Sequence, residues 1–156
     1  DSVFKLYPWE WLLAEDFARH IPESSTLFIE PVWKSILSNK GLLALMWEMF
    51  EGHPNLLPTF FADDPKAASL GDTYVRKPLY SREGQNIELV RDGQAETIHP
   101  GDYGAEGHIV QAFHALPDFT GKYPMAGCWL DVGQMPTPKN LKDFLGIAFR
   151  GPLWGC

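Results

Sequence analysis

The pattern of apolar and polar positions in the first third of the chain predicts short helices and one strand. Residues 7–17 (YPWEWLLAEDF) separate apolar from acidic positions at helical spacing, which predicts an amphipathic helix. The apolar run at residues 25–31 ends at Pro31 and predicts a buried strand, and residues 32–37 predict a second helix. Residues 42–50 (LLALMWEMF) are almost entirely apolar and precede a glycine and a proline, which predicts a largely buried helix.

The middle of the chain has the pattern of short strands separated by turns. Residues 73–77 and 87–90 predict two strands joined by the polar loop at residues 81–86. Residues 109–113 and 125–132 predict further strands. Helices alternating with such strands favour an α+β fold with a mostly antiparallel sheet. No repeat or linker interrupts the chain, so we expect a single domain over residues 1–156.

Composition and charge exclude several classes of protein. The chain has 156 residues, 45% of them hydrophobic, and a net charge of −7, which argues against a nucleic-acid-binding protein. No apolar run approaches the roughly 20 residues that span a bilayer, so we expect no membrane partner. Two cysteines make no disulfide framework, and this favours a cytoplasmic protein. The first residue is Asp1 rather than Met, which suggests a fragment.

Two lysines stand where an anion could bind. Lys77 ends a predicted strand and precedes Pro78, so its ammonium can project from a rigid element toward a bound anion. Lys40 stands where a turn enters the apolar helix, beside backbone amides that can bind phosphate. From spacing alone an ordinary surface lysine is the favoured interpretation at both positions.

The loop at residues 81–86 (SREGQN) is the third candidate. Its glycine, Gly84, allows the backbone to approach a ligand closely, so several amides could point at one anion. Many hairpin loops share this composition, and a structural turn is the alternative. The chain lacks the P-loop and dinucleotide-binding motifs, and its five histidines have no metal-binding spacing.

Six blocks follow one another along the chain: YPWEWL (7–12), EPVWK (30–34), SNKGLLALMWEMFEGHPNLLPTFF (38–61), YVRKPLYSREGQNIELV (74–90), YGAEGHIVQAFHALP (103–117) and YPMAGCWL (123–130). In this order they resemble the glutathionylspermidine synthase family, in particular its acid–amine ligase type. The resemblance covers residues 5–132, and residues 133–156 diverge from the family pattern.

The resemblance implies an incomplete part of an ATP-grasp enzyme that joins a carboxylic acid to an amine. In this family ATP phosphorylates the carboxylate, and the amine then attacks the acyl phosphate. The family's nucleotide-binding lysines match Lys40 and Lys77. Its phosphate-covering loop matches Glu83 and Gly84, with Asn86 alongside. Its adenine hinge matches four consecutive residues, Gln111, Ala112, Phe113 and His114.

The resemblance also limits what this chain is expected to do. The family's magnesium ligands belong to a segment upstream of the residues present here, so no metal ligand is assigned and Mg²⁺ is expected to be bound from elsewhere in the parent. The partners implied are ATP, a peptide-like carboxylic acid and an amine. The alternative is a degenerate ATP-grasp remnant that serves as a non-catalytic nucleotide-binding or interaction module.

Overall fold

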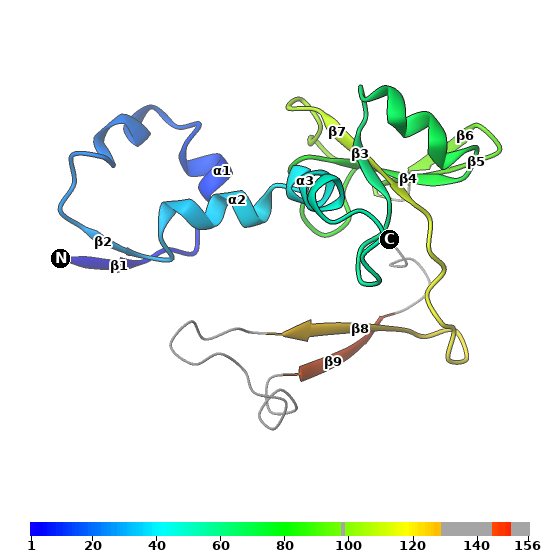
Figure 1. Ribbon diagram of the computed structural model, residues 1–156. Coiled ribbons are helices and arrows are strands. Elements are labelled where there is room, and N and C mark those ends of the chain that lie inside the picture. Colours follow the sequence, from blue (N-terminus) through cyan, green and yellow to red (C-terminus); the bar gives the residue numbers. More distant parts are fainter. Residues whose placement is uncertain (98, 129–144, 151–156) are drawn as a thin grey trace. The chain divides into compact units, whose positions relative to one another are not determined.

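A computed structural model describes residues 1–97, 99–128 and 145–150 of the chain. Its internal contacts divide it into two compact units, residues 1–112 and residues 113–156 (Figure 1). The single domain expected over residues 1–156 stays a prediction.

The first unit opens with a small segment of short elements. β1 (Ser2–Phe4) pairs in parallel with β2 (Leu27–Ile29). Between them lie α1 (Trp9–Leu12) and the 3₁₀ turn η1 (Asp16–His20), and after them η2 (Val32–Lys34) and α2 (Ser35–Ser38).

Two predictions for this segment need correction. The helix expected over residues 7–17 is only one turn long, because after Leu12 the backbone tightens and the Ala14 amide donates to the Trp11 carbonyl at 3.0 Å. The strand expected to be buried is β2, whose outer residues are exposed. Because β2 belongs to a two-stranded sheet, it is covered far less than a strand inside a larger sheet.

The core of the first unit is a five-stranded sheet with the order β3-β7-β4-β5-β6. All of its pairings are antiparallel, which confirms the predicted α+β fold with a mostly antiparallel sheet. Its strands are β3 (Thr59–Phe61), β4 (Tyr74–Pro78), β5 (Glu88–Arg91), β6 (Gln94–Thr97) and β7 (His108–Ala112). The sequence patterns missed β3, which is only three residues long, and β6, which is largely polar. Both lie at the edges of the sheet.

The helix α3 (Gly41–Met49) packs against β3 and β7 through its small residues. A Cβ at Gly41 would lie 3.1 Å from the Phe61 ring and 3.3 Å from Leu79, so a glycine permits this close approach. The prediction of a largely buried helix is wrong, since only Gly41 and Ala44 are buried and Met49 is 71% exposed. Between α3 and β4 the turn η3 (Pro65–Leu70) follows β3.

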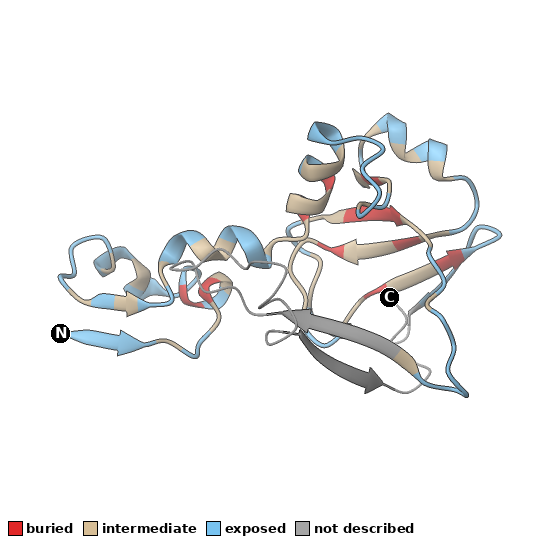
Figure 2. Ribbon diagram, turned by 60° about the horizontal axis from the view of Figure 1, so that its bottom comes forward, coloured by how far each residue is buried: buried red, intermediate tan, exposed pale blue. Residues whose placement is uncertain are grey.

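Buried residues, red in Figure 2, gather on the central strands of the sheet. Val75 of β4, Val90 of β5, and Ile109 and Val110 of β7 are each at most 7% exposed. Ile109 has no exposed surface at all. The central strands therefore form a rigid support for the polar side chains that project from them.

The second unit contains the antiparallel pair β8 (Tyr123–Cys128) and β9 (Leu145–Arg150). β8 confirms the strand predicted over residues 125–132 as far as residue 128, and the remainder lies outside the described residues. None of the helices in the described ranges has the length and apolar character needed to cross a membrane.

We expect Ile109→Ala to lower the free energy of unfolding by about 2–5 kcal/mol, because it removes a fully buried side chain from the centre of the sheet. The matched control, Leu37→Ala at a 62% exposed position of α2, should change it by less than about 0.5 kcal/mol. Urea denaturation followed by circular dichroism measures both, and equal effects would contradict this description of the core.

Candidate functional site

Lys77 is oriented by a chain of hydrogen bonds across three strands. In the β4–β7 register Lys77 lies opposite Ile109 and Val75 opposite Gln111, so Lys77 and Gln111 share a face of the sheet. The Lys77 ammonium donates to the Gln111 Oε1 at 2.8 Å, and the Gln111 Nε2 donates to the Thr59 Oγ1 at 2.8 Å. Thr59 is 1% exposed and Gln111 9%, so both have little freedom to turn away.

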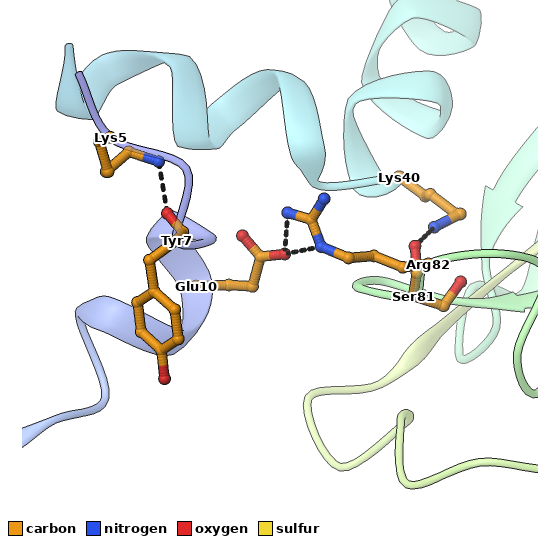
Figure 3. A network of polar contacts seen from close by, with 6 residues as sticks. All are labelled: Lys5, Tyr7, Glu10, Lys40, Ser81 and Arg82. Carbon is orange, nitrogen blue, oxygen red and sulfur yellow. Dashed lines mark hydrogen bonds and ion pairs between the residues drawn. The ribbon is translucent and has the colours of Figure 1, made fainter. Parts of the chain in front are cut away.

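Lys40 precedes α3 and contacts the loop that follows β4. Its backbone amide donates to the Leu79 carbonyl at 2.8 Å, and its ammonium donates to the Ser81 carbonyl at 3.0 Å (Figure 3). Burial lowers the pKa of Lys40, and the positive charges of Lys77 and then Arg82 lower it further, while Glu10 opposes them. The positive charge of Lys77 thus acts on the Lys40 ammonium, although the two lysines are 37 positions apart in the sequence.

The turn at Glu83 and Gly84 contains two neighbouring backbone amides that donate to no other group among the described residues. Both residues have left-handed backbones, with φ of 53° at Glu83 and 76° at Gly84. The turn is closed by the Gln85 amide, which donates to the Arg82 carbonyl at 3.0 Å. Within the described part of the chain neither the Glu83 nor the Gly84 amide donates a hydrogen bond. Such amides can bind an anion.

The Asn86 side chain makes hydrogen bonds to a neighbouring segment of the backbone. Its side-chain Nδ2 donates to the Gly101 carbonyl at 2.7 Å and also to the Tyr103 carbonyl, and its Oδ1 accepts from the Gly101 amide. These bonds hold residues 99–103 against the end of the loop. A role for Asn86 beside a nucleotide stays a prediction.

The four residues of the expected adenine hinge fall in two units. Gln111 and Ala112 end β7, and the Ala112 amide donates to the Pro58 carbonyl at 2.8 Å. Phe113 and His114 open the second unit. The structure therefore brings Gln111 to Lys77, and the hinge role of all four residues stays a prediction.

Sequence reasoning missed the contact between Glu10 and Arg82. Arg82 Nη2 and Nε donate to one oxygen of Glu10 at 2.7 and 3.1 Å. The two residues are 72 positions apart, so no local pattern could have revealed their contact. A cavity of about 620 Å³ lies beside them, lined by acidic and aromatic side chains together with Arg82 and Gln85. Its lining is Glu10, Trp11, Tyr80, Arg82, Glu83, Gln85, Asp102, Tyr103 and Glu106.

The metal ligands that the resemblance places outside this chain stay a prediction. In the ranges 1–97, 99–128 and 145–150 no three or more His, Cys, Asp or Glu side chains are grouped so as to hold a metal ion.

We expect Lys77→Met to raise the pKa of Lys40, because it removes a neighbouring positive charge that disfavours the charged ammonium. Titration of the lysine ¹³Cε signals by NMR measures this change. The control Lys66→Met, at an exposed lysine of η3, should leave the Lys40 titration where it is. An unchanged Lys40 pKa in Lys77→Met would show that the two ammonium groups do not interact.

Known proteins are similar to this chain over most of its length. The family described as "Glutathionylspermidine synthase preATP-grasp" matches residues 1–137. A Haemophilus influenzae protein named "Putative acid--amine ligase" is 41% identical over 157 residues, covering 95% of this chain and 39% of that protein.

Two longer relatives match a smaller part. The "Bifunctional glutathionylspermidine synthetase/amidase" of Escherichia coli is 34% identical and covers 69% of this chain. The "Trypanothione synthetase" of Crithidia fasciculata is 32% identical and covers 67%. The chain spans 17% and 16% of these proteins and about two fifths of the Haemophilus influenzae protein. The match over residues 1–137 is decisive: the chain belongs to the glutathionylspermidine synthase family.

Proposed function

We propose that this chain is the nucleotide-binding part of an ATP-dependent ligase that joins a carboxylic acid to an amine. The observation that carries the proposal is that hydrogen bonds hold both lysines beside the end of β4, Lys77 through Gln111 and Lys40 through the Ser81 carbonyl. Burial and then the charge of Lys77 lower the pKa of Lys40. Holding two ammonium groups together costs free energy through their repulsion, and a bound polyanion reverses that cost. The names of the relatives, acid–amine ligase and glutathionylspermidine synthetase, favour a ligase reaction.

In this proposal the two lysines bind the phosphates of ATP from different elements. Lys77 is directed by Gln111, and Lys40 is held beside Ser81, so each ammonium is oriented before the nucleotide binds. Preorganised cations of this kind stabilise the charge that develops during phosphoryl transfer. The chemistry supplied by ATP is activation of the carboxylate as an acyl phosphate, which an amine can attack.

The loop and the end of β7 complete the nucleotide site in this proposal. The Glu83 and Gly84 amides cover the phosphates from the loop, with Asn86 holding the end of that loop in place. The backbone of Gln111, Ala112, Phe113 and His114 contacts the adenine. Residues 1–156 would then form part of an ATP-grasp enzyme whose magnesium ligands and pockets for a peptide-like acid and an amine belong to the rest of the parent.

We expect MgATP to raise the melting temperature of the full-length protein, since a nucleotide at about 100 times its Kd stabilises the folded state by about 2.7 kcal/mol. Lys40→Ala and Lys77→Ala should each weaken binding about tenfold or more, because a hydrogen bond to a charged group contributes about 1.5–3 kcal/mol. Differential scanning fluorimetry with a nucleotide titration measures both effects.

The control for these variants is Lys66→Ala, which removes an exposed lysine of η3. MgATP should raise the melting temperature of this variant as much as that of the wild type. Full stabilisation by MgATP in both Lys40→Ala and Lys77→Ala would overturn the assigned site. Nucleotide binding without ADP formation in the presence of candidate acids and amines would instead favour the alternative, a non-catalytic nucleotide-binding module.

A further inference from the structure

The loop at residues 79–86 is anchored firmly at both ends. At its start the Leu79 carbonyl accepts from the Lys40 amide at 2.8 Å, and the Leu79 amide donates to the Gly107 carbonyl at 3.0 Å. At its end the Asn86 amide donates to the His99 carbonyl at 2.7 Å, and the Asn86 side chain bonds to Gly101. These contacts fix the two ends of the loop. The conformation of its middle, around Arg82, depends on other contacts.

In the middle of the loop, Arg82 contacts a residue 72 positions away in the sequence. Its guanidinium donates twice to Glu10 of α1, and Figure 3 shows the two side chains extended toward each other from separate elements. The Arg82 side chain is 47% exposed, whereas that of Glu10 is only 9% exposed. Glu10 is therefore the fixed member of the pair, and Arg82 is the member that it holds.

The neighbours of Glu10 on α1 explain why it is fixed. Trp9 is 3% exposed and packs on Phe28 with ring centroids 5.3 Å apart. Trp11 stacks on Tyr103 with centroids 6.5 Å apart and an interplanar angle of 15°. Since Tyr103 also accepts a hydrogen bond from Asn86, α1 is tied to the same structure that ends the loop.

Burying the Glu10 carboxylate has a cost that its contacts do not fully offset. One oxygen accepts both bonds from Arg82, while the buried Oε2 has no hydrogen-bond partner in the described structure. A buried, partly satisfied carboxylate is weak support for stability. The main effect of the Glu10 carboxylate is therefore on the conformation of Arg82 and the loop, and not on the stability of the fold.

We infer that Glu10 is a positioning residue for the phosphate-covering loop: by holding Arg82, it sets the loop conformation that presents the Glu83 and Gly84 amides. This inference rests on the proposed nucleotide-binding function and goes beyond it, because Glu10 itself does not contact the nucleotide. Without Glu10, the middle of the loop samples other conformations. Nucleotide binding must then order the loop, and this entropic cost lowers the affinity of the protein for the nucleotide.

The first test is the affinity of the full-length protein for ATP, measured by isothermal titration calorimetry. Glu10→Gln keeps the shape of the side chain and removes its charge, and we expect affinity to fall about tenfold, as for other losses of preorganisation. Glu106→Gln is the matched control, because it removes one negative charge from the same cavity at a residue that does not hold Arg82. It should leave the affinity within about twofold of the wild type.

A double-mutant cycle tests whether Glu10 acts through Arg82. If it does, Glu10→Gln has no further effect on ATP affinity once Arg82→Gln is present. A purely structural role for Glu10 would give additive losses, which would overturn the inference.

A second measurement needs no nucleotide. Trypsin cleaves after arginine, so the rate of cutting between Arg82 and Glu83 reports how often the middle of the loop leaves its place. Glu10→Gln should raise that rate about tenfold if it opens the loop, with cleavage after Arg91 as the internal reference. The comparison of the two cleavage rates stays valid if Glu10→Gln lowers the stability of the protein, because global unfolding would accelerate both cleavages equally.

The outcomes separate the inference from the function on which it rests. A wild-type protein that fails to bind ATP overturns both. Wild-type binding that is lost in Lys77→Ala and unchanged or tighter in Glu10→Gln overturns the role of Glu10 alone, as does equal acceleration of both cleavages. Weaker binding in Glu10→Gln, non-additivity with Arg82→Gln and selective cleavage after Arg82 support it.

Discussion

The antiparallel pairing of β4 with β7 is the constraint on which the rest of the site depends. It places Lys77 and Gln111 on one face of the sheet, and it brings Gln111 of β7 within reach of both Lys77 and Thr59. The fully buried Ile109 lies opposite Lys77 in the same register. A slip of one residue would turn Lys77 and Ile109 to opposite faces, so burial of the core and orientation of the lysine are enforced together.

The second lysine, Lys40, is positioned by the packing of a helix and not by strand pairing. Lys40 stands at the start of α3, whose close packing through Gly41 against Phe61 and Leu79 fixes its position. The ammonium then reaches the Ser81 carbonyl and experiences the charge of Lys77, and both this charge and burial lower its pKa. A helix start and a strand thus supply the two lysines, while the loop between β4 and β5 supplies backbone amides.

This loop is tied to three separate parts of the first unit: to α3 through Lys40, to residues 99–103 through Asn86, and to α1 through the Glu10–Arg82 pair. Within the part of the chain that the structure describes, Glu10 of the small segment that precedes the sheet pairs with Arg82 of the loop, and Trp11 of that segment stacks on Tyr103.

Much of the fold could be predicted from the sequence, because local patterns encode it. The strands β4, β5 and β7 and the helix α3 follow from runs of apolar residues closed by glycine and proline, and the family follows from ordered blocks. Lys40, Lys77 and the loop were identified as candidates, with surface positions as the alternative. Exposure of β2 and of much of α3, and the short length of α1, were not foreseen, because burial depends on which elements a segment meets.

The sequence by itself determined the strands β4, β5 and β7, the position of α3, the α+β class and the family, since local patterns and ordered blocks of neighbouring residues encode them. Only the tertiary structure decided that Lys77 is oriented by Gln111 and Thr59, that Asn86 supports the loop, and that Glu10 holds Arg82. The physical reason is distance along the chain. Glu10 and Arg82 are 72 positions apart and Gln111 and Thr59 are 52 apart, so only the folding of the chain brings these side chains within hydrogen-bonding distance.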